Sequence, residues 1–498
     1  MASSIKQLST FLPPQSIKNA YFGGDIAISN DVIVGSSVQS QGDGSVSVFV
    51  KGRTDSDTWP GISLYAPANT TNVGFGVAVA VQSNNDESII AIGAINDINE
   101  KGVDTGAVYI YERLGSWWEM TQRIDGYQLK SGDRFGASLA IDGDRLVIGA
   151  SYGDSHHGND VDAGRAFVYV RKNGQYTLEQ ELARTGASQN TDDFYGYSVS
   201  IEGDVVLVGA YGTDHGATNS GSVYVFVFDD ATSTWIQETI LMSEDKVAED
   251  YFGYSVSLSG NYALIGAFGV DGDGGMQSGA AYMYLRNAKH GTWTSTQKLI
   301  SDDANTEDQF GSCVKLSNEG ATALIGARAD DDLGSGSGSV YIFTSSSHKV
   351  NLKQKGKLLA SDGTTGDWFG FSLAIDDTQA VVGAPLKNSN SGQAYLFSIP
   401  TGHIESKERA DNDDAVIACS VVIGLLVFIG VALFVLRKQG LLPDGMELAI
   451  MRMESKMADM WKSIKPEKEE NFFGGTDSNS SGKSDTYSPL DVNKVAAV

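Results

Sequence analysis

The chain has 498 residues, of which 58 are glycine and only 9 are proline, and tyrosine, phenylalanine and valine are abundant. This composition favours many short strands joined by tight turns, and it argues against disorder for most of the chain. The formal net charge of −26 argues against a nucleic-acid ligand, because binding to phosphate backbones draws on clustered lysine and arginine.

The first 15 residues, MASSIKQLSTFLPPQ, contain neither the basic region nor the apolar run of a signal peptide. A membrane segment is nevertheless predicted further along the chain, so three explanations stay open. In order of preference, a signal preceded the given sequence, the later apolar segment acts as a reverse anchor, or the N-terminal domain is cytosolic.

An aromatic residue followed by glycine recurs along the chain at steps of 53, 60, 60, 57, 58 and 59 residues. A fixed period of this length is typical of repeat architectures. The seven pairs are Phe22-Gly23, Phe75-Gly76, Phe135-Gly136, Tyr195-Gly196, Phe252-Gly253, Phe310-Gly311 and Phe369-Gly370. The sequence therefore predicts seven structural units.

Each unit contains four strand-like runs, which in the fourth unit are YGYSVSIEG, DVVLVGA, GSVYVF and WIQETIL. Four antiparallel strands per unit make a propeller blade. The predicted fold is therefore all-β, with a seven-bladed β-propeller over residues 1–400.

The last unit ends near Pro400 without a fourth strand, while the chain begins with a strand-like segment, residues 5–8, ahead of the first unit. We expect residues 5–8 to form the outer strand of the last blade. Main-chain hydrogen bonds would then close the ring and remove an open sheet edge.

A Gly-Ala pair follows each aromatic–glycine pair, with Gly35-Ser36 in the first unit. This pattern resembles the FG-GAP repeat of the integrin α-subunit propeller, over about residues 1–400. The resemblance implies a seven-bladed propeller and a ligand-binding face made by the fourth-to-first and second-to-third strand loops. The chain departs from those subunits in lacking Asp-rich hairpin loops and leg domains, which argues against a partner of the integrin β type.

Aspartates recur at two positions of the repeat. One lies two residues before the aromatic, and the other follows the Gly-Ala alanine by three or four residues; the members are Asp133, Asp193, Asp250, Asp308, Asp367, Asp97, Asp154, Asp214, Asp271, Asp330 and Asp331. Strand alternation places both sets on one face. Either these side chains accept hydrogen bonds from loop amides, or part of the ring, namely Asp154, Asp214, Asp330 and Asp331, meets a ligand.

Two loops have the oxygen-rich composition that Ca²⁺ requires. One contains Asp271 and Asp273 in GVDGDGGMQSG, and the other contains Asp97, Asn99 and Asp104 in NDINEKGVD. Calcium is the only cofactor that the sequence suggests. No motif of a nucleophile, a zinc protease or a phosphate-binding loop occurs, so we do not expect an enzyme.

Asn69-Thr70-Thr71 is the only N-glycosylation sequon before residue 400. Glycosylation at Asn69 would mark the propeller as extracellular or lumenal.

Residues 415–436 are 22 consecutive residues without a charge, and as a helix they would span ~33 Å, enough for a bilayer core. The preceding linker, residues 401–414, is acidic, and Arg437 and Lys438 follow the apolar run. Since basic residues favour the cytoplasmic side, we predict a transmembrane helix with a cytoplasmic tail, residues 437–498.

Within this tail, residues 446–464 place apolar side chains on one face of a short helix, which could lie on the membrane or bind a partner. The remainder is rich in Gly, Ser and Asp and is predicted to be disordered.

The sequence thus favours a single-pass plasma-membrane or endomembrane protein that presents a propeller for adhesion or recognition of a protein or glycan ligand. The alternative is a non-enzymatic scaffold subunit of an endomembrane complex.

Overall fold

The computed structural model of the chain describes residues 5–14, 18–38, 44–52, 58–67, 73–84, 87–126, 129–154, 162–185, 191–345, 351–376 and 378–400. All of them fall within one compact unit, Met1–Ile404.

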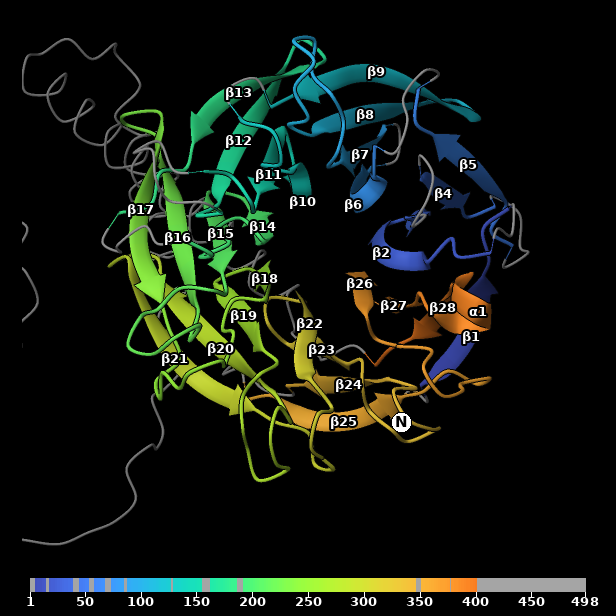
Figure 1. Cartoon of the computed structure of the whole chain (residues 1–498), viewed down its shortest axis with the longest axis vertical. Coiled ribbons are helices and arrows are strands. Elements are labelled where there is room, and N and C mark those ends of the chain that lie inside the picture. The colour runs from blue at the N-terminus through green and yellow to red at the C-terminus, as the bar shows by residue number, and fades with distance from the viewer. Residues whose placement is uncertain are drawn as a thin grey trace, which may run out of the picture. The chain divides into compact units, whose positions relative to one another are not determined.

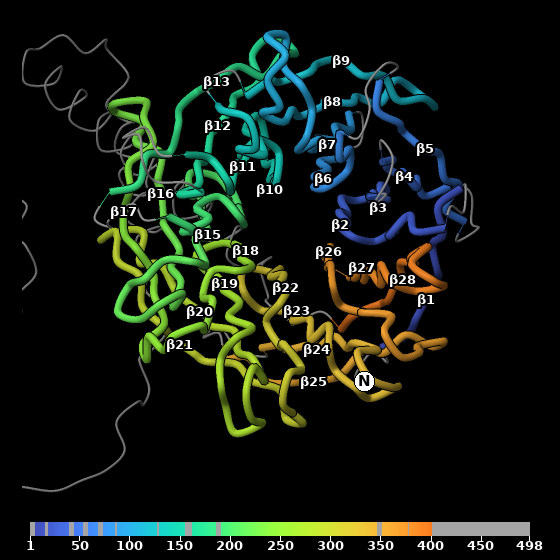
Figure 2. The backbone as a smooth tube through the Cα atoms, in the orientation of Figure 1, coloured from blue at the N-terminus to red at the C-terminus, as the bar shows by residue number. Residues whose placement is uncertain are grey.

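Seven four-stranded antiparallel sheets surround a central axis as the blades of a propeller (Figure 1). Within a blade the chain starts at the strand nearest the axis and proceeds outwards, as the backbone trace shows (Figure 2). The predicted all-β fold and the predicted number of blades are confirmed.

The strand bounds in chain order are as follows. The first three blades contain β2 (Phe22–Ser29), β3 (Val32–Ser37), β4 (Ser45–Val50) and β5 (Gly61–Tyr65); β6 (Phe75–Ser83), β7 (Ser88–Ala94), β8 (Ala107–Leu114) and β9 (Trp117–Asp125); and β10 (Phe135–Asp142), β11 (Arg145–Ala150), β12 (Arg165–Lys172) and β13 (Gln175–Glu181). The next three contain β14 (Ser198–Glu202), β15 (Val205–Ala210), β16 (Ser222–Asp229) and β17 (Thr234–Leu241); β18 (Ser255–Ser259), β19 (Tyr262–Ala267), β20 (Ala280–Asn287) and β21 (Thr292–Leu299); and β22 (Phe310–Ser317), β23 (Thr322–Ala327), β24 (Ser339–Thr344) and β25 (Lys353–Leu358). The seventh contains β26 (Ser372–Asp376), β27 (Gln379–Ala384), the short turn α1 (Lys387–Asn390), β28 (Gln393–Ser398) and the N-terminal β1 (Lys6–Phe11).

The pattern of side chains explains which strands are inside. β7, with the sequence SIIAIGA, is buried at every position, as expected for a strand covered on both faces. The outer strand β21 alternates between more and less exposed residues instead. The apolar cores lie between neighbouring blades; one of them joins Val32 of the first blade to Phe75 and Tyr109 of the second.

The aromatic–glycine pair has a double structural role. The ring of Phe252 is fully buried and packs edge-on against Tyr282, with centroids 5.4 Å apart. Gly253 has a φ of +90°, and a Cβ there would lie 2.6 Å from the Ser222 carbonyl oxygen. A Cβ on Gly209, in the Gly-Ala pair of the preceding blade, would lie 2.2 Å from the Gly253 carbonyl oxygen. The two glycines therefore allow neighbouring blades to approach closely.

The ring closes through the N-terminal strand. β1 pairs antiparallel with β28, which gives the last sheet the order β1-β28-β27-β26. The position that we assigned to residues 5–8 is thus taken by the longer strand Lys6–Phe11. Phe11 is buried and packs against Phe49 of the first blade, with centroids 4.8 Å apart.

Glutamines connect the outer strands of neighbouring blades. Gln122 accepts a hydrogen bond from the Tyr176 amide and donates one to its carbonyl, both at 2.7 Å. Gln180 makes the same pair of bonds to Trp235. In the closing strand, Gln7 accepts a hydrogen bond from the Ser361 amide of the sixth-to-seventh blade connection at 3.3 Å.

Five predictions fall outside the described residues: the sequon at Asn69, the linker 401–414, the transmembrane helix 415–436, the cytoplasmic tail 437–498 and its amphipathic helix 446–464. Among the residues that the structure does describe, no helix is long and apolar enough to cross a membrane.

Candidate binding face

The connections between strands are unequal on the two sides of the propeller. The hairpin between the first and second strands of the fourth blade runs only from Glu202 to Val205, whereas the second-to-third connection runs from Ala210 to Ser222. This long connection lies beside the next fourth-to-first connection, where the Glu249 amide donates to the Thr218 carbonyl at 2.9 Å. We call the side formed by these two sets of connections the loop face.

In the five repeats that have an aspartate two residues before the aromatic, this aspartate is buried, and in at least four of them it shapes its own loop. Asp308 accepts a hydrogen bond from the amide of Asn305 at 2.7 Å, and Asp133 accepts one from the amide of Lys130 at 2.8 Å. Asp367 and Asp250 bind the amides three residues earlier in the same way. These aspartates therefore accept hydrogen bonds from loop amides, which is the first of the two roles that we considered for the recurring aspartates.

Two of these buried aspartates also have a cation beside them. Asp193 pairs with Arg184 at 2.7 Å, and Asp367 pairs with Lys387 at 2.7 Å. No such pair exists among the described residues for Asp133, Asp250 or Asp308, and burial raises the pKa of each to about 6. Burial disfavours the charged form, and their amide hydrogen bonds only partly offset this cost.

Asp308 and Asp367 give a matched test of this difference. We expect Asp308→Asn to raise the free energy of unfolding by ~2 kcal/mol at pH 7.5, since the amide oxygen still accepts the Asn305 hydrogen bond and no charge is buried. Because the folded-state pKa of Asp308 lies above its unfolded value, the gain shrinks as the pH falls through 6 towards 4. Asp367→Asn leaves Lys387 without its buried partner and should instead destabilise at pH 7.5. Urea unfolding of both variants between pH 4.5 and 8 measures this; equal effects of the two would contradict it.

The aspartates that follow the Gly-Ala pair have two kinds of contact. Asp214, Asp271 and Asp331 are exposed, and each accepts a hydrogen bond from an amide five or six residues later in its own loop. Asp97 and Asp330 are buried and are bound by the tyrosine of the third strand, Tyr109 and Tyr341 respectively. Three of the aspartates that follow the Gly-Ala pair therefore also accept hydrogen bonds from amides of their own loops.

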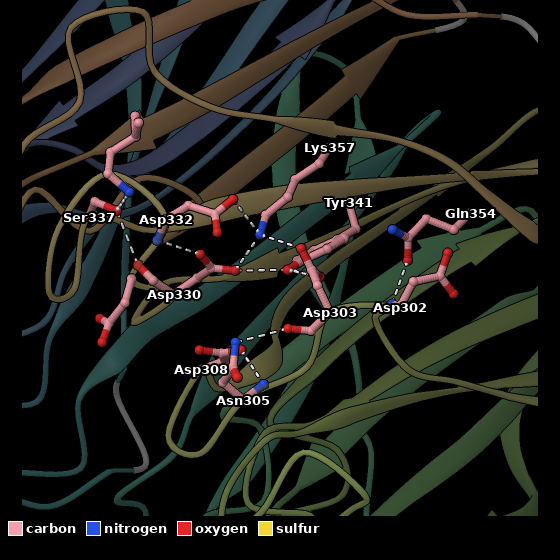
Figure 3. Close-up of polar contacts among 12 residues, drawn as sticks. Asp302, Asp303, Asn305, Asp308, Asp330, Asp332, Ser337, Tyr341, Gln354 and Lys357 are labelled. Atoms are coloured by element: carbon pink, nitrogen blue, oxygen red, sulfur yellow. Dashed lines mark hydrogen bonds and ion pairs between the residues drawn. The ribbon is translucent and has the colours of Figure 1, made fainter.

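The most highly connected of these side chains surround Lys357, near the end of β25 (Figure 3). Its ammonium lies 2.9, 2.8 and 2.7 Å from carboxylate oxygens of Asp303, Asp330 and Asp332. The Tyr341 hydroxyl lies 2.7 Å from a carboxylate oxygen of Asp303 and 2.7 Å from one of Asp330, and it can donate its proton to either. Burial alone would lower the pKa of Lys357, but its hydrogen bonds to the three carboxylates outweigh burial and raise it. The predicted ligand residue Asp330 is thus held inside an internal ion-pair cluster.

The other predicted ligand residues are further apart. Asp154 pairs with the exposed Lys130 at 2.9 Å in the third blade. Asp331 lies in the same loop as Asp330, but it contacts the Gly336 amide rather than Lys357. The structure therefore places these residues on one face without joining them into one site.

The two calcium candidates also differ. Asp97, Asn99 and Asp104 occupy one loop, where Asn99 accepts hydrogen bonds from the amides of Lys101 and Val103. Burial, and secondly the charge of Asp97, raises the pKa of Asp104, whose Oδ1 is buried and lacks a hydrogen-bond partner. Asp271 and Asp273 are exposed. Among the described residues, no group of three or more His, Cys, Asp or Glu side chains has the geometry of a metal site.

The basic partners of these carboxylates were not predicted from the sequence. Lys357, Lys298 and Arg123 all come from outer strands and pair with Asp330, Asp245 and Asp97 respectively. The available signal was a basic residue one or three positions after the glutamine that recurs in the outer strands, as in TQR, TQK and KQKGK.

Five segments of the chain match the FG-GAP repeat family: residues 118–169, 183–226, 235–284, 293–343 and 352–397. The chain is an FG-GAP repeat protein. Its propeller fits the integrin-α-like FG-GAP architecture. The FG-GAP segment 235–284 runs from β17 of the fourth blade to β20 of the fifth, so a sequence repeat is offset from a blade. Because each repeat begins with the outer strand of the preceding blade, the N-terminal strand β1 becomes the outer strand of the last blade. No curated protein matches this FG-GAP protein significantly.

Proposed function

We propose that this FG-GAP protein is a non-enzymatic recognition or adhesion protein whose loop face binds a protein or glycan ligand. The observation that carries the proposal is the asymmetry of the connections. Long second-to-third and fourth-to-first strand connections gather on one face, while tight hairpins predominate on the other. Binding residues concentrate on loops held by a rigid scaffold.

The proposal includes presentation of the propeller at a membrane. Residues 415–436 would anchor the chain, with the propeller extracellular or lumenal and the tail cytoplasmic. The apolar length of this segment and the basic residues after it support this arrangement. Glycosidase sensitivity of Asn69, combined with protease protection in intact cells, tests it.

The function itself is tested with purified residues 1–404, which contain the compact unit. We expect saturable binding to at least one component of an array of cell-surface proteins and glycans. No binding across such an array would leave the recognition function without support.

Calcium would assist recognition by ordering a loop. We expect 1 mM CaCl₂ to raise the melting temperature by ~3 °C relative to EDTA, because binding to the folded state alone stabilises it. Asp104→Asn should remove the shift if the loop of Asp97 and Asn99 holds the ion, and Asp273→Asn should remove it if the other loop does. An unchanged melting temperature in the wild type would end the calcium proposal.

A scaffold subunit of an endomembrane complex is the second candidate. It is favoured by exposed apolar side chains on the outer strands of five consecutive blades: Leu8, Ile62, Met120, Leu178 and Ile236. A stoichiometric membrane partner in co-purification from native membranes, lost when these residues are changed to serine, would favour this function.

A further inference from the structure

A backbone conformation that suits glycine recurs on the loop face, where large side chains occupy it. In every repeat the residue before the aromatic–glycine pair has φ between 53° and 64°. The second blade places Gly74 there, which adopts this conformation without steric cost. Four other blades place Tyr21, Phe194, Tyr251 and Trp368 there, residues for which such a φ is strained. The fold requires the conformation but not these side chains, so they need another explanation.

Phe194 and Trp368 belong to a continuous series of aromatic rings, which we call the aromatic strip: Tyr152, Phe194, Tyr211, Tyr254, Phe268 and Trp368. Tyr251 lies beside the strip and stacks on Phe268, with centroids 5.0 Å apart. Successive centroid distances are 5.3 Å from Tyr152 to Phe194, 5.0 Å on to Tyr211, 5.4 Å on to Tyr254 and 4.6 Å on to Phe268. Arg328 connects Phe268 to Trp368, with 5.6 Å from its guanidinium carbon to each ring. The strip extends from the third blade to the seventh.

The aromatic strip is separate from the structural cores. None of its six residues belongs to the clusters of buried side chains between blades, and all are partly accessible, with Trp368 36% exposed. The strip therefore lies outside the buried cores, although its rings touch from blade to blade, as Tyr152 and Phe194 do.

The arginines at the strip differ from the other arginines of this acidic protein. Of the nine arginines that the structure describes, seven lie within 4.0 Å of a carboxylate. The two without such a pair among the described residues are Arg134 and Arg328. Arg134 stacks 3.8 Å from the Tyr152 ring at one end of the strip. Arg328 donates through Nε to Gln309 Oε1 at 2.7 Å, and its one other hydrogen bond to a described residue is a long one of 3.4 Å to the Tyr254 hydroxyl.

A guanidinium has five N–H donors in a planar fork that matches a carboxylate. At Arg328 most of these donors have no protein acceptor among the described residues, although the chain has a net charge of −26. The flat faces of aromatic side chains provide apolar contact for the rings of a ligand. A small number of polar protein groups then fixes the orientation of the bound ligand.

We propose that the aromatic strip binds a carbohydrate chain that carries isolated carboxylate-bearing sugars, with sugar rings packed on the aromatic faces and carboxylates held by Arg328 and Arg134. This inference rests on the proposed recognition function and names its ligand class. Exposed acidic side chains beside the strip, Asp192, Glu249 and Glu307, disfavour a densely charged polyanion. Neutral sugars must therefore separate the acidic ones.

The test is a titration of residues 1–404 with a hyaluronan hexasaccharide, in which carboxylate sugars alternate with neutral ones, and with neutral chitohexaose as the control. We expect at least tenfold tighter binding of the acidic chain. Arg328→Gln and Arg134→Gln should each reduce that binding about tenfold, whereas Arg113→Gln, which alters an arginine paired with Asp31, should not.

Phe194→Gly separates binding from folding, because glycine suits the φ of 53° at this position. We expect it to weaken hexasaccharide binding at least fivefold while the protein still unfolds in one cooperative transition. The proposal is overturned if the hexasaccharide does not bind, or if its affinity is unchanged in the arginine variants. Binding only of acidic peptides would assign the strip to a protein ligand and would also overturn it. If the array of cell-surface proteins and glycans yields a ligand whose affinity is the same for these variants as for the wild type, the recognition function is supported and this inference fails.

Discussion

Replacing Lys357 by methionine is expected to lower the free energy of unfolding by ~3 kcal/mol at pH 7.5. The substitution leaves Asp303, Asp330 and Asp332 around an apolar side chain, and Asp330 has only 4% of its side chain exposed. Three carboxylates then repel one another without a cation, and burial increases the cost. Urea unfolding measured by tryptophan fluorescence gives this difference.

The matched control for this variant is Lys298→Met. Lys298 occupies the outer strand of the fifth blade and pairs with Asp245, but their side chains are 40% and 43% exposed. Solvent screens such a pair, so we expect a loss below ~1 kcal/mol. A loss of the same size in both variants would show that the environment of Lys357 contributes nothing beyond an ordinary surface pair.

Deleting residues 1–11 is expected to lower the melting temperature by more than ~10 °C and to cause aggregation. The deletion removes β1, exposes the edge of β28, and takes Phe11 out of the core that it shares with Phe49. A lost buried phenylalanine costs ~3–5 kcal/mol, and an open strand edge pairs readily with other chains.

The control for the deletion is Leu8→Ala, which changes an exposed side chain of the same strand and should shift the melting temperature by less than ~1 °C. Circular dichroism melts with light scattering follow both effects. Retention of a cooperative, unshifted melt after the deletion would contradict closure of the ring by β1.

The repeat and the fold could be predicted because the aromatic–glycine pair recurs in every blade and the Gly-Ala pair in every blade but the first, which has Gly35-Ser36. Phe252 fills a core and Gly253 allows close contact with the preceding blade, so substitution at either is costly and the period stays visible. The bounds of the closing strand were harder to predict, because the alternating burial of β1 continues to Phe11 although Gln7 and Ser9, its other inward positions, are polar.

The ion-pair cluster and the aromatic strip could not be predicted in the same way. Lys357 meets Asp303 and Asp330 only after three separate segments of the sixth blade come together. The strip depends on side chains that differ from blade to blade at one shared backbone position: Gly74 in the second blade, Arg134 in the third and Phe194 in the fourth. Aligning the repeats reveals the position, but only the structure shows that the rings touch.

The proposed binding of a ligand by the loop face is tested most directly by comparing two variants. The loop-face variant carries Arg328→Gln and Trp368→Ala; the hairpin-face variant carries Asp144→Asn and Asp204→Asn, which lie in exposed first-to-second strand hairpins. Binding of both to the ligand captured by residues 1–404 is measured by surface plasmon resonance. We predict that the loop-face variant loses at least 90% of its affinity while the hairpin-face variant keeps that of the wild type. Loss of binding in the hairpin-face variant alone would contradict the account.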